Sequence, residues 1–308
     1  MANLLDIRRR IKSVKNTQQI TKAMKMVSAA KLKRAQDRVL AARPYALKMS
    51  EVLASLASRT DESFAHPLMS ARDDKRYLLV LVTSDKGLCG GFNANLQRAA
   101  QSFQREHADK EISLVTVGRK GRDFFRRRGA SIVEEYVGLT SKDRVEYSEA
   151  IEVARSIIKR FSEDETLDKV FIIFSEFKSA LQQRVVTQQL LPIASLRPQG
   201  IQGTEAVATE QVGESQADAP TAASTEYLYE QPAAEIFSRL LPRYVETQIY
   251  RALLESVASE QGSRMTAMDS ASKNAGELIN ALTLNMNRIR QAAITKEIIE
   301  VVSGAAAL

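Results

Sequence analysis

The sequence has few of the residues from which metal sites and disulfide-stapled domains are built. Its 308 residues include one cysteine, Cys89, two histidines, His66 and His107, and no tryptophan. A single thiol cannot close a disulfide within the chain, which excludes a disulfide-stapled secreted domain. One thiol and two imidazoles also fall short of the three or four ligands of a usual zinc site. The sequence therefore predicts no metal site and no bound cofactor.

A long apolar run is missing as well. No stretch approaches the roughly 20 apolar residues that a membrane-spanning helix needs. Near the N-terminus, Arg8, Arg9 and Arg10 are followed by more charge, where a signal peptide would be apolar. We therefore expect a soluble intracellular chain without a membrane span. Its 44 Lys and Arg against 37 Asp and Glu give a net charge of +7, which favours an anionic partner.

Glycine is distributed very unevenly. None occurs before Gly87, seven lie from Gly87 to Gly138, and only three follow Gly213. Glycine is costly inside helices and useful in tight turns between strands and helices. The distribution therefore predicts a long helix at each end of the chain and an α/β domain between them.

Each terminal segment carries an apolar seam with the spacing of a coiled coil. The first helix is expected over residues 3–58, with a kink at Pro44, and the second over 234–302. We expect the two helices to pair antiparallel. The polar middle of the first seam either packs weakly, or faces water or another protein. The seams run through Ile7, Ile11, Val14, Gln18, Thr21, Lys25, Ser28, Leu32, Ala35 and Val39, and through Met265, Met268, Ser272, Ala275, Ile279, Leu282, Met286, Ile289 and Ala293.

Strand and helix signals alternate in the middle of the chain, which predicts parallel strands joined by crossovers. The expected fold class is α/β with long terminal helices: an antiparallel coiled coil plus a Rossmann-like domain. The predicted parts are a rod helix over 1–58, a foot domain over 77–195, an acidic flexible insertion over 200–232 and a second rod helix over 234–308. The insertion holds six acidic residues and no Lys or Arg. The strands are expected at 77–83, 112–117, 131–137, 170–175 and 184–191.

Three features invite a catalytic interpretation, and each has a simpler one. The glycine-rich turn 87–91 lies between a strand and a helix, but it lacks the spacing of the dinucleotide and phosphate-loop motifs, so we interpret it as structural. Cys89 has no histidine nearby in the sequence and is expected to be a buried thiol. Glu134 and Glu135 are expected on a solvated strand face. No catalytic residue is predicted.

The first 60 residues are strongly basic, with 14 Lys and Arg against three acids. Three interpretations stay open: a solvated helix face, a nucleic-acid-binding helix, and a helix that docks on an acidic protein surface. Met24 and Met26 are expected to be packing residues, with flexible partner contact as the alternative. The apolar C-terminus, 301–308, suits a hydrophobic socket. A small nucleotide-binding α/β enzyme is a further alternative.

Five stretches resemble the gamma chain of bacterial F-type ATP synthase. They are ITKAMKMV at 20–27, RPY at 43–45, TSDKGLCGGFN at 83–93, SEQ with RMTAM across 259–268, and RQAAITKEIIE with SGA across 290–305. The resemblance implies a central-stalk rotor that couples proton flow through a membrane ring of c subunits to ATP synthesis, without catalysing it. Its partners would be the alpha and beta subunits of a hexamer, the epsilon chain and the c ring, at the cytoplasmic face of the bacterial inner membrane. It implies no nucleic-acid partner.

The resemblance also implies roles for individual residues. Contacts with the beta subunit would come from Met24, Lys25, Arg264, Arg290, Gln291, Thr295 and Glu297. The tip of the rod, in an apolar bearing, would consist of Val301, Val302, Ala305 and Leu308. Within the insertion, the region from Gly200 to Ala223 departs from the family in being longer and more acidic, and its role stays open.

Overall fold

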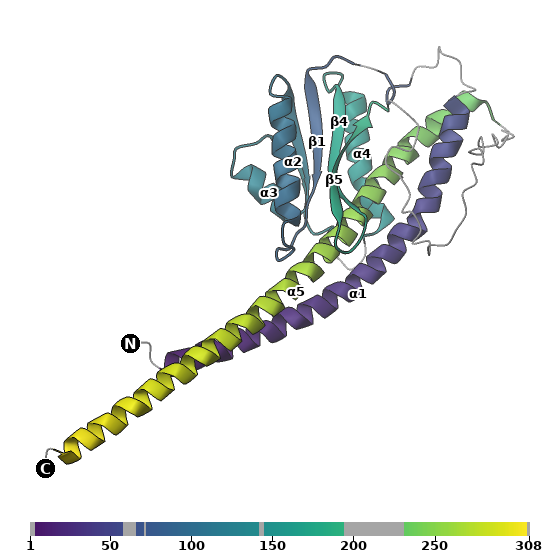
Figure 1. The fold of residues 1–308 in the computed structure, drawn as a ribbon. Helices are drawn as coiled ribbons and strands as arrows, with labels where there is room; N and C mark the ends of the chain where they lie inside the picture. The colour runs from purple at the N-terminus through teal and green to yellow at the C-terminus, as the bar shows by residue number, and fades with distance from the viewer. Residues whose placement is uncertain (1–3, 58–65, 71, 142–144, 194–230, 307–308) are drawn as a thin grey trace, which may run out of the picture.

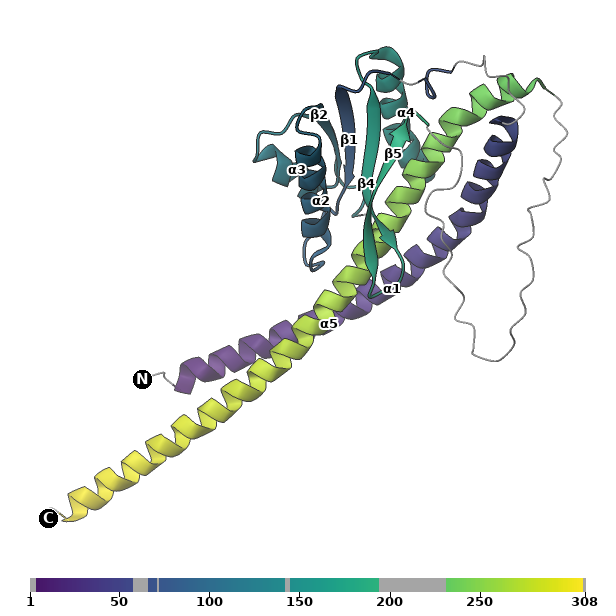
Figure 2. The same cartoon turned by 45° about the horizontal axis from the view of Figure 1, so that its top comes forward.

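The computed structural model describes residues 4–57, 66–70, 72–141, 145–193 and 231–306. Two long helices dominate it: α1 (Leu4–Ala57) and α5 (Ala233–Ala306). They run antiparallel along most of α1, and α5 then continues alone past the first residues of α1 (Figures 1 and 2). At 1.5 Å per residue, the 74 residues of α5 extend about 110 Å. The predicted rod is therefore present. Pro44 lies within α1 without ending it.

The two heptad seams hold α1 and α5 together as the sequence predicts. Every seam residue is buried or half-buried, whereas the positions between them on the rod are mostly exposed. Leu32, Ala35 and Val39 of α1 belong to the same apolar core as the part of α5 that packs on the sheet domain. Farther along the rod Met268 and Ala275 are also buried. The small Ala and Ser side chains allow the helices to approach closely.

Five strands form one sheet in the order β3-β2-β1-β4-β5. Four are parallel, as expected, but β5 runs antiparallel to β4. The turn between β4 and β5 is too short for a crossover, and antiparallel pairing is what a short connection allows. The strands are β1 (Arg76–Val82), β2 (Glu111–Val117), β3 (Ile132–Tyr136), β4 (Lys169–Phe177) and β5 (Gln183–Leu191).

Helices cover both faces of the sheet and give it two cores. On one face, α2 (Phe92–Glu106) and α3 (Arg119–Arg126) pack through Phe92, Leu96 and Phe125. On the other, α4 (Tyr147–Glu163) and α5 share a larger core that also takes in α1. Figure 1 shows α2 and α3 on the side of the sheet away from the rod. The part of the rod beside the sheet is thus one layer of the domain, and the rest of the rod projects from it (Figure 1).

The prediction that Glu134 lies on a solvated face is wrong. Its carboxylate accepts hydrogen bonds from Ser156 Oγ at 2.6 Å, Tyr136 Oη at 2.8 Å and Arg160 Nη2 at 3.0 Å. Burial disfavours the charged form, but these donors outweigh it and hold the pKa of Glu134 below its usual value. Glu134 therefore ties edge strand β3 to α4. Its neighbour Glu135 is more exposed and pairs with Arg126.

Candidate partner-binding surface of the rod

The polar middle of the first seam faces α5 rather than water. Lys25 Nζ lies 2.6 Å from Asp269 Oδ1, and both side chains keep partial contact with solvent. Gln18 Nε2 donates to the carbonyl oxygen of Ser272 at 3.3 Å, beside Gly276, where a Cβ would come within 3.0 Å of that amide nitrogen. The hydrogen bonds from Lys25 and then Lys273 lower the pKa of Asp269. A few polar contacts therefore replace tight apolar packing in this section of the rod.

Arg264, predicted to contact a partner, bonds within the chain. Its guanidinium is almost wholly buried, with Nη2 2.6 Å from Glu260 Oε1 and 3.2 Å from the carbonyl oxygen of Gly87. Burial raises the pKa of Glu260, against the attraction of Arg264. The residue thus fastens the glycine-rich turn of the foot domain to the rod.

Helix α5 occupies the crevice where sheets of this topology bind nucleotides. The strand order reverses between β1 and β4, and ligands of open α/β sheets bind beyond the carboxyl ends of the strands at such a point. Here Ser259 Oγ donates to the carbonyl oxygen of Ser175 at the end of β4 (3.0 Å), and the N–H of Ser175 donates to Ser256 Oγ (3.2 Å). Together with the bond from Arg264 to Gly87, in the segment that follows β1, these bonds place α5 against this edge of the sheet.

The side chain of Asp85 occupies the position of a bound anion. Its Oδ1 accepts the N–H of Arg119, at the start of α3, and that of Gly138, each at 3.0 Å. Its Oδ2 accepts the Thr140 hydroxyl at 2.9 Å. Free N–H groups at a helix start attract phosphates, but here the chain's own carboxylate takes them. Turn 87–91 leads into α2 rather than α3, so its interpretation as structural stays a prediction.

Gly118 is required where β2 meets α3. Its φ is +93°, and a Cβ there would lie 2.2 Å from the carbonyl oxygen of Thr83. No side chain fits that distance, so this glycine permits the close approach of two strand ends.

Cys89 is a buried thiol, as predicted. It is 2% exposed, and Asn93 Nδ2 lies 3.1 Å from its sulfur. Burial raises the pKa of the thiol, which disfavours the reactive thiolate.

The distal part of α5 presents most of the predicted contact residues. Arg290, Gln291, Thr295 and Glu297 are all exposed, beyond the section that α1 covers. The Thr295 hydroxyl donates to the carbonyl oxygen of Gln291 one turn earlier, at 2.9 Å. Neither Arg290 nor Glu297 forms an ion pair with any residue that the structure describes, which leaves both charges available to a partner.

Large apolar side chains are exposed on the same part of α5. The exposed fractions are 57% for Ile298, 71% for Val301 and 62% for Val302, and Ala305 is exposed too. Leu308, also predicted for the tip, lies outside the described residues. Exposed apolar clusters are typical of interaction surfaces, which favours a role of this segment in binding.

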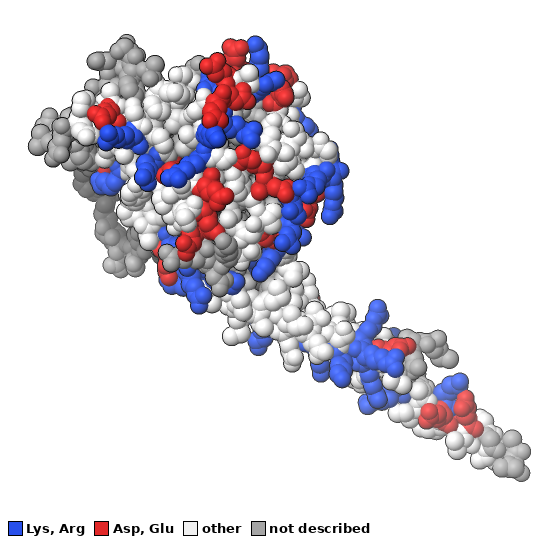
Figure 3. Space-filling model, turned by 180° about the vertical axis from the view of Figure 1, so that it is seen from behind, with Lys and Arg blue, Asp and Glu red and all other residues white. Residues whose placement is uncertain are grey.

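Met24 and Met26 differ in their surroundings. Met24 is half-buried, whereas Met26 is 67% exposed, so the prediction that both pack within the chain is wrong for Met26. The alternative of partner contact remains for it. Lys and Arg side chains gather on the rod beyond the sheet domain (Figure 3), where the basic residues of α1 are exposed.

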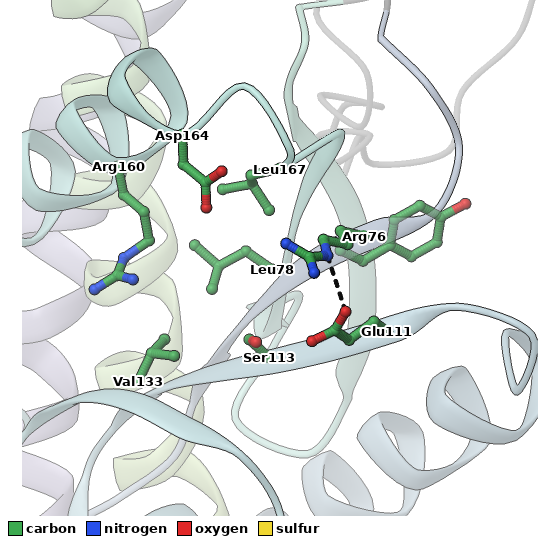
Figure 4. A pocket seen from close by; sticks show the side chains of 9 residues that line it. Arg76, Leu78, Glu111, Ser113, Val133, Arg160, Asp164 and Leu167 are labelled. Carbon is green, nitrogen blue, oxygen red and sulfur yellow. Dashed lines mark ion pairs between the residues drawn. The ribbon is translucent and has the colours of Figure 1, made fainter.

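A pocket at the amino ends of the strands offers little to a ligand (Figure 4). Its volume is about 80 Å³, and Arg76, which lines it, pairs with Glu111 at 2.9 Å. Ligand pockets usually exceed about 300 Å³ and lie at the carboxyl ends of the strands. Over the described residues, no group of His, Cys, Asp and Glu could hold a metal ion, and no helix is long and apolar enough to cross a membrane.

Several residues that hold the rod and the foot domain together were missed by sequence reasoning. Asp269, Glu260, Asp85 and Ser175 were not singled out, although each holds two parts of the fold together. The sequence could have indicated the pairing of Glu260 with Arg264, because opposite charges four residues apart on a helix lie side by side. Asp85 lies two residues before the glycine-rich turn, and nothing in the local sequence indicates its distant partners.

Comparison with known proteins gives a consistent result. A family model described as ATP synthase matches residues 3–308. The ATP synthase gamma chain of Solibacter usitatus is 50% identical over 311 residues, covering 100% of this chain and 99% of the relative. That of Pelotomaculum thermopropionicum is 48% identical and covers 100% of both.

Solved structures are similar along most of the chain. A chain from the central stalk and c ring of the mitochondrial ATP synthase of Tetrahymena thermophila is 29% identical, with a TM-score of 0.59, and the match covers 82% of this chain and 99% of that one. A chain of the Euglena gracilis mitochondrial enzyme is 17% identical, with a TM-score of 0.64 over 99% and 94% of the two chains, and shares the fold.

Proposed function

The chain belongs to the ATP synthase gamma chain family, and on this premise we propose that it is the central rotor shaft of an F-type ATP synthase. The observation that carries the proposal is the distal part of α5, a single helix with exposed apolar and charged side chains beyond the end of α1. A rotor shaft must insert into another protein and present side chains that this protein can bind. A single helix with exposed apolar and charged side chains meets both requirements.

The proposed partners occupy the two ends of the molecule. The distal part of α5 would lie within the hexamer of alpha and beta subunits, while the sheet domain, as a foot, would contact the epsilon chain and the ring of c subunits. The complex would then lie at the cytoplasmic face of the bacterial inner membrane, with this chain as a peripheral part. We propose the division into rod, foot and insertion stated above, with 200–232 as a separate acidic segment.

Contacts with the beta subunit are proposed for residues that the fold leaves accessible. Arg290, Gln291, Thr295 and Glu297 supply hydrogen bonds, and a guanidinium can pair with a carboxylate through two donors. Met24 and Lys25 would add contacts where the seam is polar. Because its guanidinium is buried, Arg264 is proposed to support this surface indirectly, by holding α5 in place. Val301, Val302, Ala305 and Leu308 would form the apolar tip.

We propose that the chain performs no bond-making step itself. This is supported by the bonds of α5 at the β1–β4 reversal, and by Asp85, whose carboxylate takes backbone donors at the start of α3 and at Gly138 that could otherwise bind an anion. Rotation of the shaft would instead force the catalytic subunits through their successive states. Because the polar seam holds few interlocking apolar contacts, the rod could change partners without large barriers.

The test is a double substitution, Arg290→Ala with Gln291→Ala, in the purified complex. Loss of a hydrogen bond to a charged group costs about 1.5–3 kcal/mol, so contact with the beta subunit should weaken roughly tenfold or more. ATP-driven ion pumping should fall relative to ATP hydrolysis. Arg288→Ala is the matched control, since it removes the same charge two residues away, on another side of the helix. Unchanged pumping in the double variant would contradict the contact assignment.

A further inference from the structure

A second cavity lies where α1, α4 and α5 meet. Its volume is about 280 Å³, close to the lower end of ligand pockets. It belongs to neither the crevice nor the distal part of α5. The two rod helices contribute residues from the end of the rod opposite the tip. Its lining includes Tyr45, Tyr147, Arg243, Tyr250 and Arg251.

Contacts within the chain fix most of the side chains that line this cavity. The rings of Tyr147 and Tyr250 meet edge to face, with centroids 5.2 Å apart. The side chain of Arg251 is almost fully buried, and its Nε lies 3.1 Å from Glu255 Oε1. Because its charge is paired in this way, Arg251 contributes to the shape of the cavity and not to its net charge. Tyr45, in contrast, is 55% exposed. The cavity therefore has fixed aromatic and aliphatic sides and one tyrosine that solvent reaches.

The rim of the cavity carries an excess of positive charge. The buried carboxylate of Glu246 accepts the hydroxyl of Tyr147 at 3.3 Å and faces two guanidiniums, those of Arg155 at 3.7 Å and Arg243 at 3.8 Å. Both arginine side chains are more than half exposed. Among the described residues, Glu246 is the carboxylate that pairs with both guanidiniums, and it can neutralise only one of them. One positive charge is thus left for a further acidic group.

We propose that this cavity receives an apolar or aromatic side chain of another subunit, next to an aspartate or glutamate that pairs with Arg243. Tyrosine and arginine are enriched at the energetic centres of protein interfaces, where an anchor side chain enters a desolvated pocket. The excess guanidinium charge selects an acidic neighbour for that anchor. The proposal rests on the proposed function for the choice of partner: a subunit on the foot side of the complex, because the cavity lies away from the tip.

Photo-crosslinking in the intact complex tests the inference. Tyr45 is replaced by the photoreactive residue p-benzoylphenylalanine, and Arg105, an exposed residue of α2, is replaced likewise as a control. At position 45 we expect a crosslink to a subunit other than alpha and beta, at an apolar residue adjacent to Asp or Glu. A crosslink to alpha or beta, or within this chain only, would overturn the proposal. Failure of alpha and beta to copurify would instead contradict the rotor function.

A charge variant gives an independent measurement. Arg243→Gln should weaken retention of the foot-side subunit roughly tenfold, the effect of losing a hydrogen bond between charged groups. Arg239→Gln is the matched control: Arg239 lies one turn earlier on α5, is 68% exposed, pairs with Glu235 and does not line the cavity. Both variants should retain the hexamer. Equal retention of the foot-side subunit by the two variants would overturn the proposal.

Discussion

Lys25 and Asp269 join the two rod helices through an ion pair of 2.6 Å that is partly open to solvent. The hydrogen bonds from Lys25 and Lys273 lower the pKa of Asp269 in the folded chain. A carboxylate with a lowered folded-state pKa stabilises the fold above its unfolded pKa, and that contribution disappears as the pH falls through the folded value.

The variant Asp269→Asn should therefore be less stable than the parent chain at pH 7, and the difference should vanish in acid. The unfolded pKa of aspartate is about 3.9, so the two stabilities should converge below about pH 4. Urea unfolding at several pH values measures this. Asp37→Asn, on the exposed pair with Lys33, is the control. A difference that is constant with pH would show that the ion pair is not the cause.

The seam around this pair was predictable and its bonds were not. Spacing alone placed Ile7 and Met268 on facing stripes, because a helix repeats its faces every three to four residues. The pairing of Ser175 with Ser259, 84 positions apart, depends on how the foot domain sits on the rod. No local pattern contains that information. The same holds for Asp85, whose carboxylate accepts the backbone N–H groups of Arg119 and Gly138.

Exposure on the distal part of α5 also followed from the sequence only indirectly. Periodicity placed Ile289 and Ala293 on the seam, and both are half-buried. It did not indicate that Ile298 and Val301 would remain uncovered, because that depends on where α1 begins. The unequal lengths of the two helices leave these side chains without a partner in the chain.

Removal of the buried guanidinium of Arg264 should strongly destabilise the chain. Arg264→Ala leaves the carboxylate of Glu260 buried beside the foot domain without its partner, which costs about 3–5 kcal/mol. Arg239→Ala breaks an exposed pair of the same spacing and should cost less than about 1 kcal/mol. Chemical unfolding of the two purified variants compares them directly.

The loss of folding stability in Arg264→Ala should also depend on pH. Burial raises the folded pKa of Glu260, and removal of Arg264 raises it further. A group with a raised folded pKa favours the fold at low pH and loses that contribution as the pH rises through the folded value. The deficit should thus shrink on acidification. A deficit of equal size at pH 5 and pH 8 would indicate lost packing instead.

Gly118 and Gly138 provide a matched test of backbone strain against steric clash. Both have φ near +95°, but a Cβ at Gly118 would lie 2.2 Å from the Thr83 carbonyl oxygen, whereas nothing lies within 4 Å at Gly138. Gly138→Ala should cost about 1–3 kcal/mol from strain alone. Gly118→Ala should cost clearly more, since β1 and β2 must move apart. Similar unfolding midpoints for the two variants would contradict the clash.

The exposed apolar tip should matter for assembly and not for folding. Val301→Asp with Val302→Asp should change the free energy of unfolding of the chain by about 0.5 kcal/mol at most, because both side chains are already exposed. If a partner buries them, each valine contributes about 1.5–3 kcal/mol to binding, and the double variant should lose more than about a hundredfold in affinity for the alpha and beta hexamer. Ser303→Asp, also at an exposed position, controls for added charge. Titration of the parent chain and of each variant into the hexamer measures the affinity. Equal binding by the parent and both variants would mean that no partner buries the tip.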